Sequence, residues 1–72
     1  MTKKDGANAP KYKFLREDPG NCRVYYKDHD RLFCLQRDSP KNVTFYRCSE
    51  DGEPEYECLM PNLAEFSGLK VP

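Results

Sequence analysis

The sequence has no long apolar run and no excess of charge of either sign. Its longest uninterrupted apolar run spans residues 32–35, which is far too short to cross a membrane. Lysine plus arginine and aspartate plus glutamate both number 12, so no global charge draws the 72-residue chain to nucleic acid or to an anionic membrane. A Gly-rich phosphate loop and an ordered aromatic-basic repeat are also missing. We therefore expect no nucleic-acid partner and no membrane insertion.

The chain contains few of the residue combinations that catalysis requires. It contains one histidine, His29, which is far in sequence from every serine, although nucleophilic hydrolysis needs a hydroxyl or thiol beside a base. Its clustered carboxylates lack the apolar neighbours that a general acid-base pair requires. We expect no enzymatic activity, no catalytic residue and no cofactor, and we place His29 in an exposed turn.

Four cysteines stand singly at Cys22, Cys34, Cys48 and Cys58. Structural zinc sites usually present their ligands in close C-x₂₋₄-C pairs, and the absence of such a pair predicts that the chain has no metal site. An even number of cysteines in so short a chain is instead typical of a disulfide framework in a secreted protein. Three connectivities are possible, and we favour Cys22–Cys58 with Cys34–Cys48, because the outer bond would join an early and a late strand that could lie in different sheets. The inner bond would be strained if its cysteines were directly opposed across a hairpin.

Prolines and turn residues divide the chain into short β-type stretches. The stretches are rich in Tyr, Phe and Val and are five to seven residues long. They span residues 11–16, 22–27, 31–37, 43–48 and 55–59. Their short connections predict antiparallel hairpins, so residues 11–72 should form one all-β domain. The expected fold is a small disulfide-stapled antiparallel β-sandwich or partly open barrel of five to six strands, preceded by a flexible leader at residues 1–10.

Alternation along the stretches indicates which residues face the core. Val24 and Tyr26 share one side of their stretch, whereas residues 31–37 carry apolar side chains on both sides and should form the most buried strand. After the last stretch, residues 62–66 predict a single turn capped by Asn62. The alternative is a sixth short strand at residues 69–71.

Binding to another protein is the function that a small stapled sheet serves well. An edge strand offers unpaired N–H and C=O groups to an added strand. Tyr25 is a candidate aromatic anchor, since tyrosine gives a large contact area at little entropic cost. Five acidic residues late in the chain are candidates for determining the specificity of partner binding. They are Glu50, Asp51, Glu53, Glu55 and Glu57. Asn42 begins an Asn-Val-Thr glycosylation triplet, which is usable if the chain enters a eukaryotic secretory pathway.

Two segments resemble the MAX effectors of plant-pathogenic fungi, a family that includes Magnaporthe avirulence proteins and ToxB-like toxins. The first is Cys22-Arg23-Val24-Tyr25-Tyr26 followed by a polar turn, and the second is the stretch from Cys58 to Gly68. The resemblance implies a six-stranded β-sandwich of two small sheets and a disulfide between Cys22 and Cys58. The extra Cys34 and Cys48 and the residues before the first cysteine depart from the family pattern.

The resemblance also implies a function. It predicts a secreted virulence or avirulence effector that is translocated into host cells and acts, as a monomer, by binding a host plant protein. An immune receptor could recognise such an effector through an edge strand, for example with a heavy-metal-associated domain. The alternatives are a secreted antifungal or toxin-like β-barrel, against which the neutral net charge counts, and an inhibitor of host hydrolases.

Overall fold

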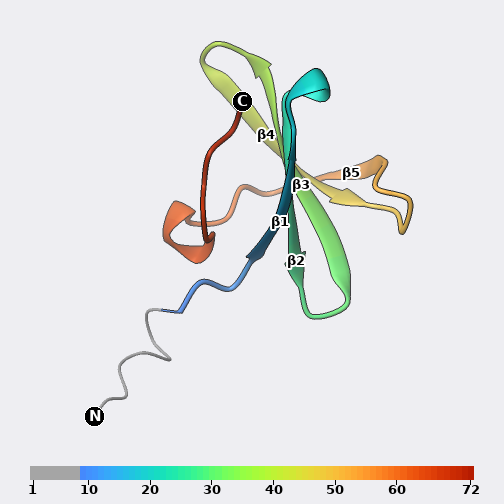
Figure 1. Cartoon of the computed structure of the whole chain (residues 1–72), viewed down its shortest axis with the longest axis vertical. Helices are drawn as coiled ribbons and strands as arrows, with labels where there is room; N and C mark the ends of the chain where they lie inside the picture. Colours follow the sequence, from blue (N-terminus) through green and yellow to red (C-terminus); the bar gives the residue numbers. More distant parts are fainter. Residues whose placement is uncertain (1–8) are drawn as a thin grey trace.

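The computed structural model describes residues 9–72 and forms one five-stranded antiparallel sheet with the strand order β1-β2-β3-β4-β5 (Figure 1). Each strand pairs with its neighbour in sequence, as in a meander. The strands are β1 (Lys13–Asp18), β2 (Arg23–Asp28), β3 (Arg31–Ser39), β4 (Asn42–Cys48) and β5 (Pro54–Cys58), and two short 3₁₀ turns are η1 (Pro19–Asn21) and η2 (Leu63–Glu65). The predicted all-β antiparallel class is confirmed, with five strands in a single open sheet. Nearly all of the predicted leader at residues 1–10 lies outside the described residues.

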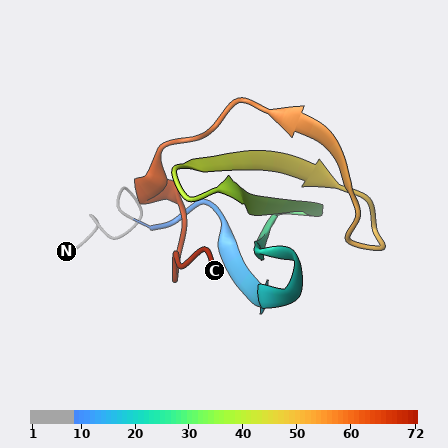
Figure 2. The same cartoon turned by 90° about the horizontal axis from the view of Figure 1, so that it is seen from above.

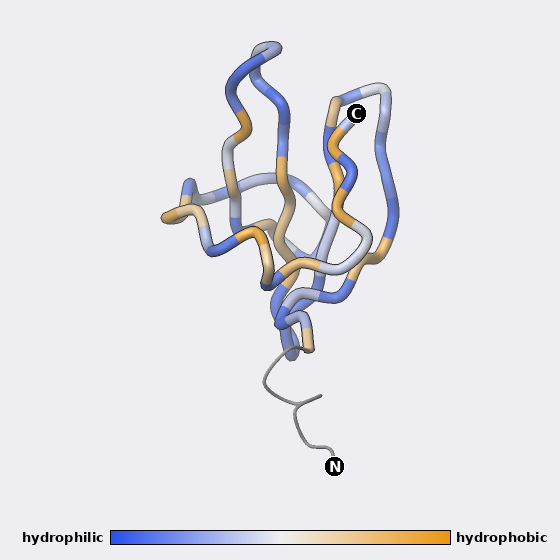
Figure 3. The backbone as a smooth tube through the Cα atoms, turned by 90° about the vertical axis from the view of Figure 1, so that its left-hand side faces the viewer, coloured by the Kyte–Doolittle hydropathy of each residue, from blue (hydrophilic) through white to orange (hydrophobic). Residues whose placement is uncertain are grey.

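Short polar turns make the hairpins. Between β2 and β3 the chain reverses through His29, whose φ of 56° lies in the left-handed region. Between β1 and β2 it turns through η1, and Cys22 ends this turn with a φ of 55° while its N–H donates to the carbonyl of Pro19. Figure 3 shows hydrophilic hairpin arms and apolar segments nearer the centre. The sequence therefore reverses where its polar residues can remain in water.

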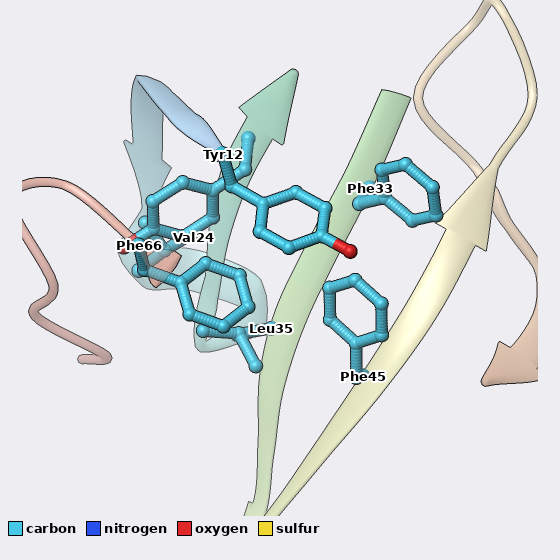
Figure 4. Close-up of a cluster of buried hydrophobic side chains, with 7 residues drawn as sticks. Tyr12, Val24, Phe33, Leu35, Phe45 and Phe66 are labelled. Carbon is cyan, nitrogen blue, oxygen red and sulfur yellow. The ribbon is translucent and has the colours of Figure 1, made fainter. Parts of the chain in front are cut away.

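One face of the sheet carries an aromatic core (Figure 4). Phe33 and Phe45 stack with their ring centroids 5.1 Å apart, and Tyr12 stacks on Phe66 at 4.6 Å. The members of this aromatic core are Tyr12, Val24, Tyr26, Phe33, Leu35, Phe45 and Phe66. Tyr12 and Phe66 come from outside the strands and are joined by an isolated parallel bridge. The two ends of the described chain therefore close this face together.

A smaller cluster fills the opposite face. It contains Tyr25, Cys34 and Cys48, with Leu32 and Tyr46 packed against them. Successive side chains of a strand point to opposite faces, so the apolar residues of β3 contribute alternately to the aromatic core on one face and to the smaller cluster on the other. The predicted burial of residues 31–37 on both sides is confirmed by the central place of β3 and its buried Phe33, Cys34 and Leu35.

After β5 the chain returns across the sheet (red in Figures 1 and 2) and places Phe66 over the aromatic core. The η2 turn on this path is capped as predicted: Asn62 Oδ1 accepts from the N–H of Ala64, and the Glu65 carboxylate accepts from the N–H of Asn62. Residues 69–71 are not a strand. The single turn was therefore the correct alternative.

Two adjacent tyrosines of β2 are expected to respond oppositely to loss of the hydroxyl. Tyr25 donates to the carbonyl of Gly52 at 2.9 Å in a buried bond, whereas the buried Tyr26 hydroxyl has no hydrogen-bond partner within residues 9–72. Tyr25→Phe should lower the free energy of unfolding by about 1–2 kcal/mol, and Tyr26→Phe should raise it by about 1 kcal/mol, because a buried unpaired hydroxyl is costly. Urea denaturation of both variants measures this. Changes of the same sign would contradict the two assigned environments.

Candidate functional site

The open sheet leaves two edge strands, β1 and β5, and the structure treats them differently. The first half of the β1 edge is occupied by the C-terminal segment: the N–H of Tyr12 donates to the carbonyl of Glu65 at 2.8 Å, and the N–H of Phe14 donates to Ser67 Oγ at 2.9 Å. Further along β1 the register shifts between Phe14 and Arg16, so Leu15 has no partner in β2. Coverage and a bulge are both devices that blunt an edge.

The β5 edge is uncovered. Apart from Glu55, which has no partner at a shift of register, its residues pair with β4 on one side. Among residues 9–72 no backbone hydrogen bond reaches β5 from the other side. Its side chains are accessible as well, since Glu55, Tyr56 and Glu57 are exposed, with Tyr56 at 64%. The strand (orange in Figures 1 and 2) lies at the rim of the sheet. It therefore offers unpaired N–H and C=O groups to an extended partner.

The acidic segment that was predicted from the sequence adjoins this open edge. Glu50, Asp51 and Glu53 lie on the β4–β5 loop, while Glu55 and Glu57 lie on β5, and all five are exposed. The structure thus brings the predicted carboxylates together along one hairpin. Glu55 and Glu57 stand on one face of β5 and Tyr56 stands on the other, because side chains alternate along a strand.

The β4–β5 loop is folded back onto the sheet. Its base is closed by the N–H of Ser49 donating to the carbonyl of Glu53 at 2.9 Å, and Gly52 is buried with a φ of 88°. A Cβ at Gly52 would lie 3.5 Å from Arg16 and 3.8 Å from the Tyr25 ring. These are ordinary contact distances, so glycine is favoured here because of its positive φ, which other residues rarely adopt.

Tyr25 is not the surface anchor that the sequence predicted. It is 2% exposed, its hydroxyl is bonded to the carbonyl of Gly52, and the Arg16 guanidinium lies 4.1 Å from the centre of its ring. Alternation along β2 indicated that Tyr25 faces away from Val24 and Tyr26, but not that the β4–β5 loop and β1 cover that face. Tyr56 is the exposed aromatic residue at the β5 edge, and its exposure follows from its place on an edge strand.

A hollow of about 640 Å³ lies beside the acidic segment, between the β2–β3 turn and the β4–β5 loop. Arg31 and Arg47 line it together with Glu50, Asp51 and Glu55. The hollow therefore presents both signs of charge. Next to β1, Lys11, Lys13 and Lys27 line a second hollow of about 510 Å³ together with Asp28 and His29. The hollow next to β1 is thus mainly basic, whereas the five exposed carboxylates gather on the β4–β5 hairpin.

The chain after β5 forms an apolar hollow of about 420 Å³ together with the sheet. Leu35 and Val43 contribute from the strands, and Met60, Leu63 and Leu69 from the returning segment. Leu63 and Leu69 are exposed at its rim. This hollow adds apolar contact area, but it lacks the open backbone groups of β5.

The four cysteines are all free thiols, and neither predicted disulfide is formed. Cys34 and Cys48 nevertheless lie in one cluster on the adjacent strands β3 and β4, where burial raises the pKa of the Cys34 thiol to about 12 and also raises the pKa of Cys48. They are diagonal rather than directly opposed, because Cys34 faces Tyr46 and Cys48 faces Leu32. The directly opposed arrangement, which would strain a bond between them, is therefore not the one present.

Two further predicted positions lie at turns. His29 is at the tip of the β2–β3 hairpin with its side chain 91% exposed, and its Nε2 is 3.8 Å from Asp28. No group of three or more metal-binding side chains occurs among residues 9–72. Asn42 is exposed at the start of β4, while the hydroxyl of Thr44 in the same triplet donates to Asp38. Hydrogen bonds from Thr44 and from Gln36 lower the pKa of Asp38.

Comparisons with protein-family models, with curated proteins and with solved structures find no match for this chain. Within the described residues, no helix has the length and apolar character needed to cross a membrane. The features available for assigning a function are therefore those of the molecule itself: an open acidic edge at β5, a covered edge at β1 and a buried pair of thiols.

Proposed function

We propose that the protein acts by binding another protein, an extended segment of which adds to the outer edge of β5. In this proposal the chain is a secreted effector and the partner is a host plant protein. The observation that supports it most directly is the uncovered β5 edge, where an added strand would find unpaired backbone groups.

The acidic side chains determine which segments fit this edge. A strand added to β5 would place its side chains beside Glu55 and Glu57 on one face and beside Tyr56 on the other. Cross-strand pairs of opposite charge are favourable, whereas like charges directly opposite are unfavourable. The preferred segment therefore alternates basic with apolar or aromatic residues.

The MAX resemblance supports the effector part of the proposal only through its two short segments. The structure departs from two of its implications: the strands form a single five-stranded sheet, and Cys22 and Cys58 are free. Recognition by a heavy-metal-associated domain through an edge strand stays a prediction. It is compatible with β5, because such recognition requires an edge that the protein does not cover itself.

A capture experiment with charge variants tests the proposal. The immobilised chain is incubated with a plant-cell lysate, and the captured proteins are identified and quantified by mass spectrometry. The double change Glu55→Gln with Glu57→Gln should reduce capture of the specific partner about two- to tenfold, because each exposed opposite-charge pair contributes roughly 0.2–1 kcal/mol. Capture by the unaltered chain should also weaken as salt is added.

The matched control is Glu17→Gln, which removes the charge of an exposed carboxylate on the opposite edge strand, β1. This control should capture the partner as well as the unaltered chain does. The proposal would be wrong if the unaltered chain captured no specific protein. Equal capture by all three chains would show that the partner binds away from β5.

A further inference from the structure

The buried thiols of Cys34 and Cys48 form a close pair that the proposed binding function does not use. Both belong to the cluster on the face opposite the aromatic core, with Cys34 0% and Cys48 7% exposed. They come from adjacent strands and are offset by two residues in the register of β3 and β4. Their thiols are near enough that each alters the protonation of the other.

The other two cysteines are separated by two strands of the sheet. Cys58 is opposite Phe45 of β4, and Cys22 precedes β2, so β3 and β4 separate the two thiols. Three strand spacings of about 4.8 Å amount to about 14 Å across a flat sheet. A disulfide needs Cα atoms within about 7 Å. The linear strand order therefore leaves Cys34 and Cys48 as the two cysteines that share one face of adjacent strands.

The β4–β5 loop adjoins this pair. Cys48 is followed directly by the loop, and Tyr25 packs in one cluster with both cysteines. The Tyr25 hydroxyl holds the loop through the carbonyl of Gly52 at 2.9 Å. Movement of the loop would therefore disturb the packing of Tyr25 against both cysteines.

We propose that Cys34 and Cys48 are a redox site that reacts with low-molecular-weight disulfides such as oxidised glutathione, and that the β4–β5 loop gates it through the bond from Tyr25 to Gly52. Cys22 and Cys58 remain thiols when this site is oxidised. The proposal is independent of the partner-binding function.

The reaction balances as two successive thiol–disulfide exchanges. The Cys48 sulfur, as thiolate, attacks one sulfur of oxidised glutathione, which forms a mixed disulfide and expels one glutathione thiolate. Cys34 then loses its proton to solvent and attacks the Cys48 sulfur, which forms the Cys34–Cys48 bond and expels the second glutathione. The protein dithiol gives up two electrons and two protons, and oxidised glutathione becomes two molecules of glutathione.

The order of attack follows from burial. The thiolate is the reactive form, and burial raises the pKa of both thiols, to about 12 for Cys34. Cys48 is the more accessible of the two and is attached to the loop that opens. Oxidation should therefore proceed through an opened state, with Cys48 reacting first.

Mapping of the reaction products tests the site. The full reduced chain is treated with oxidised glutathione, the remaining thiols are blocked with an alkylating reagent, and the peptides are analysed by mass spectrometry. The expected product has a Cys34–Cys48 crosslink with Cys22 and Cys58 alkylated, and dithiothreitol reverses it. A Cys22–Cys58 crosslink as the main product, or four alkylated cysteines after prolonged treatment, would overturn the proposal.

The rate of oxidation tests the gate. Tyr25→Phe removes the bond that holds Gly52 and should accelerate formation of the crosslink about three- to tenfold. Tyr46→Phe is the matched control, because Tyr46 packs against the same cluster but its hydroxyl makes none of the side-chain hydrogen bonds found within residues 9–72. Its rate should equal that of the unaltered chain. Equal rates for the two variants would overturn the gating by the loop.

Discussion

Phe45→Ala is expected to lower the free energy of unfolding by about 3–5 kcal/mol. Phe45 is 3% exposed, stacks on Phe33 and meets the rings of Tyr12 and Phe66 edge-on at 5.5 and 5.7 Å. Truncation would leave a cavity where the sheet, the N-terminal segment and the C-terminal segment meet. A domain of 72 residues has roughly 4–11 kcal/mol of stability in total, so the variant should be close to unfolding at room temperature.

Urea or thermal denaturation followed by circular dichroism measures this loss. The matched control is Tyr56→Ala, which truncates an aromatic residue that is 64% exposed on β5. Surface changes of this kind usually alter stability by less than about 0.5 kcal/mol. A loss of under 1 kcal/mol for Phe45→Ala would contradict the aromatic core as the main source of stability.

A proline in β5 is expected to abolish association with the partner while the domain stays folded. Successive amides of a strand point to opposite sides, so one of Tyr56 and Glu57 directs its N–H to β4 and the other directs it outward. Proline removes the N–H. Of the variants Tyr56→Pro and Glu57→Pro, one should therefore unfold or destabilise the hairpin, and the other should keep the fold and lose binding.

Leu15→Pro provides the control for this experiment. Leu15 lies at the bulge of β1 and has no partner in β2, so a proline at this position leaves the paired residues of β1 and β2 unchanged. Capture should be retained by this variant if it is folded by circular dichroism. Retention of full capture by the folded β5 variant would exclude strand addition at this edge.

The hairpins could be predicted from the sequence because their signals are local. The prolines and polar turn residues stand between runs of alternating apolar residues, and the five predicted stretches differ from the strands by two residues at most. The burial of β3 could be predicted because its middle residues are apolar on both faces of the strand. Each of these features depends on neighbours within a few residues.

The features that could not be predicted depend on residues far apart in the chain. Nothing local to Tyr12 indicates that it pairs with Phe66, 54 residues later, or that their rings close one face of the sheet. Tyr25 was expected at the surface because alternation along β2 shows only that it faces away from Val24 and Tyr26. The packing of Gly52 over this face is a long-range contact that the local sequence does not reveal. The bond between Cys22 and Cys58 was favoured because it would join strands from the beginning and the end of the sheet region, as in two facing sheets. The structure instead has one sheet in linear strand order, which separates the two cysteines.

The amide hydrogen exchange of β5, measured in the chain alone and in complex with its captured partner, tests the central claim most directly. The outward amide of β5 has no backbone partner within the described residues, so it should exchange rapidly in the free chain. In the complex it should become protected, while the amides of β1 remain unchanged. Protection that appears at β1 or at the apolar hollow, with β5 unchanged, would contradict binding through the β5 edge.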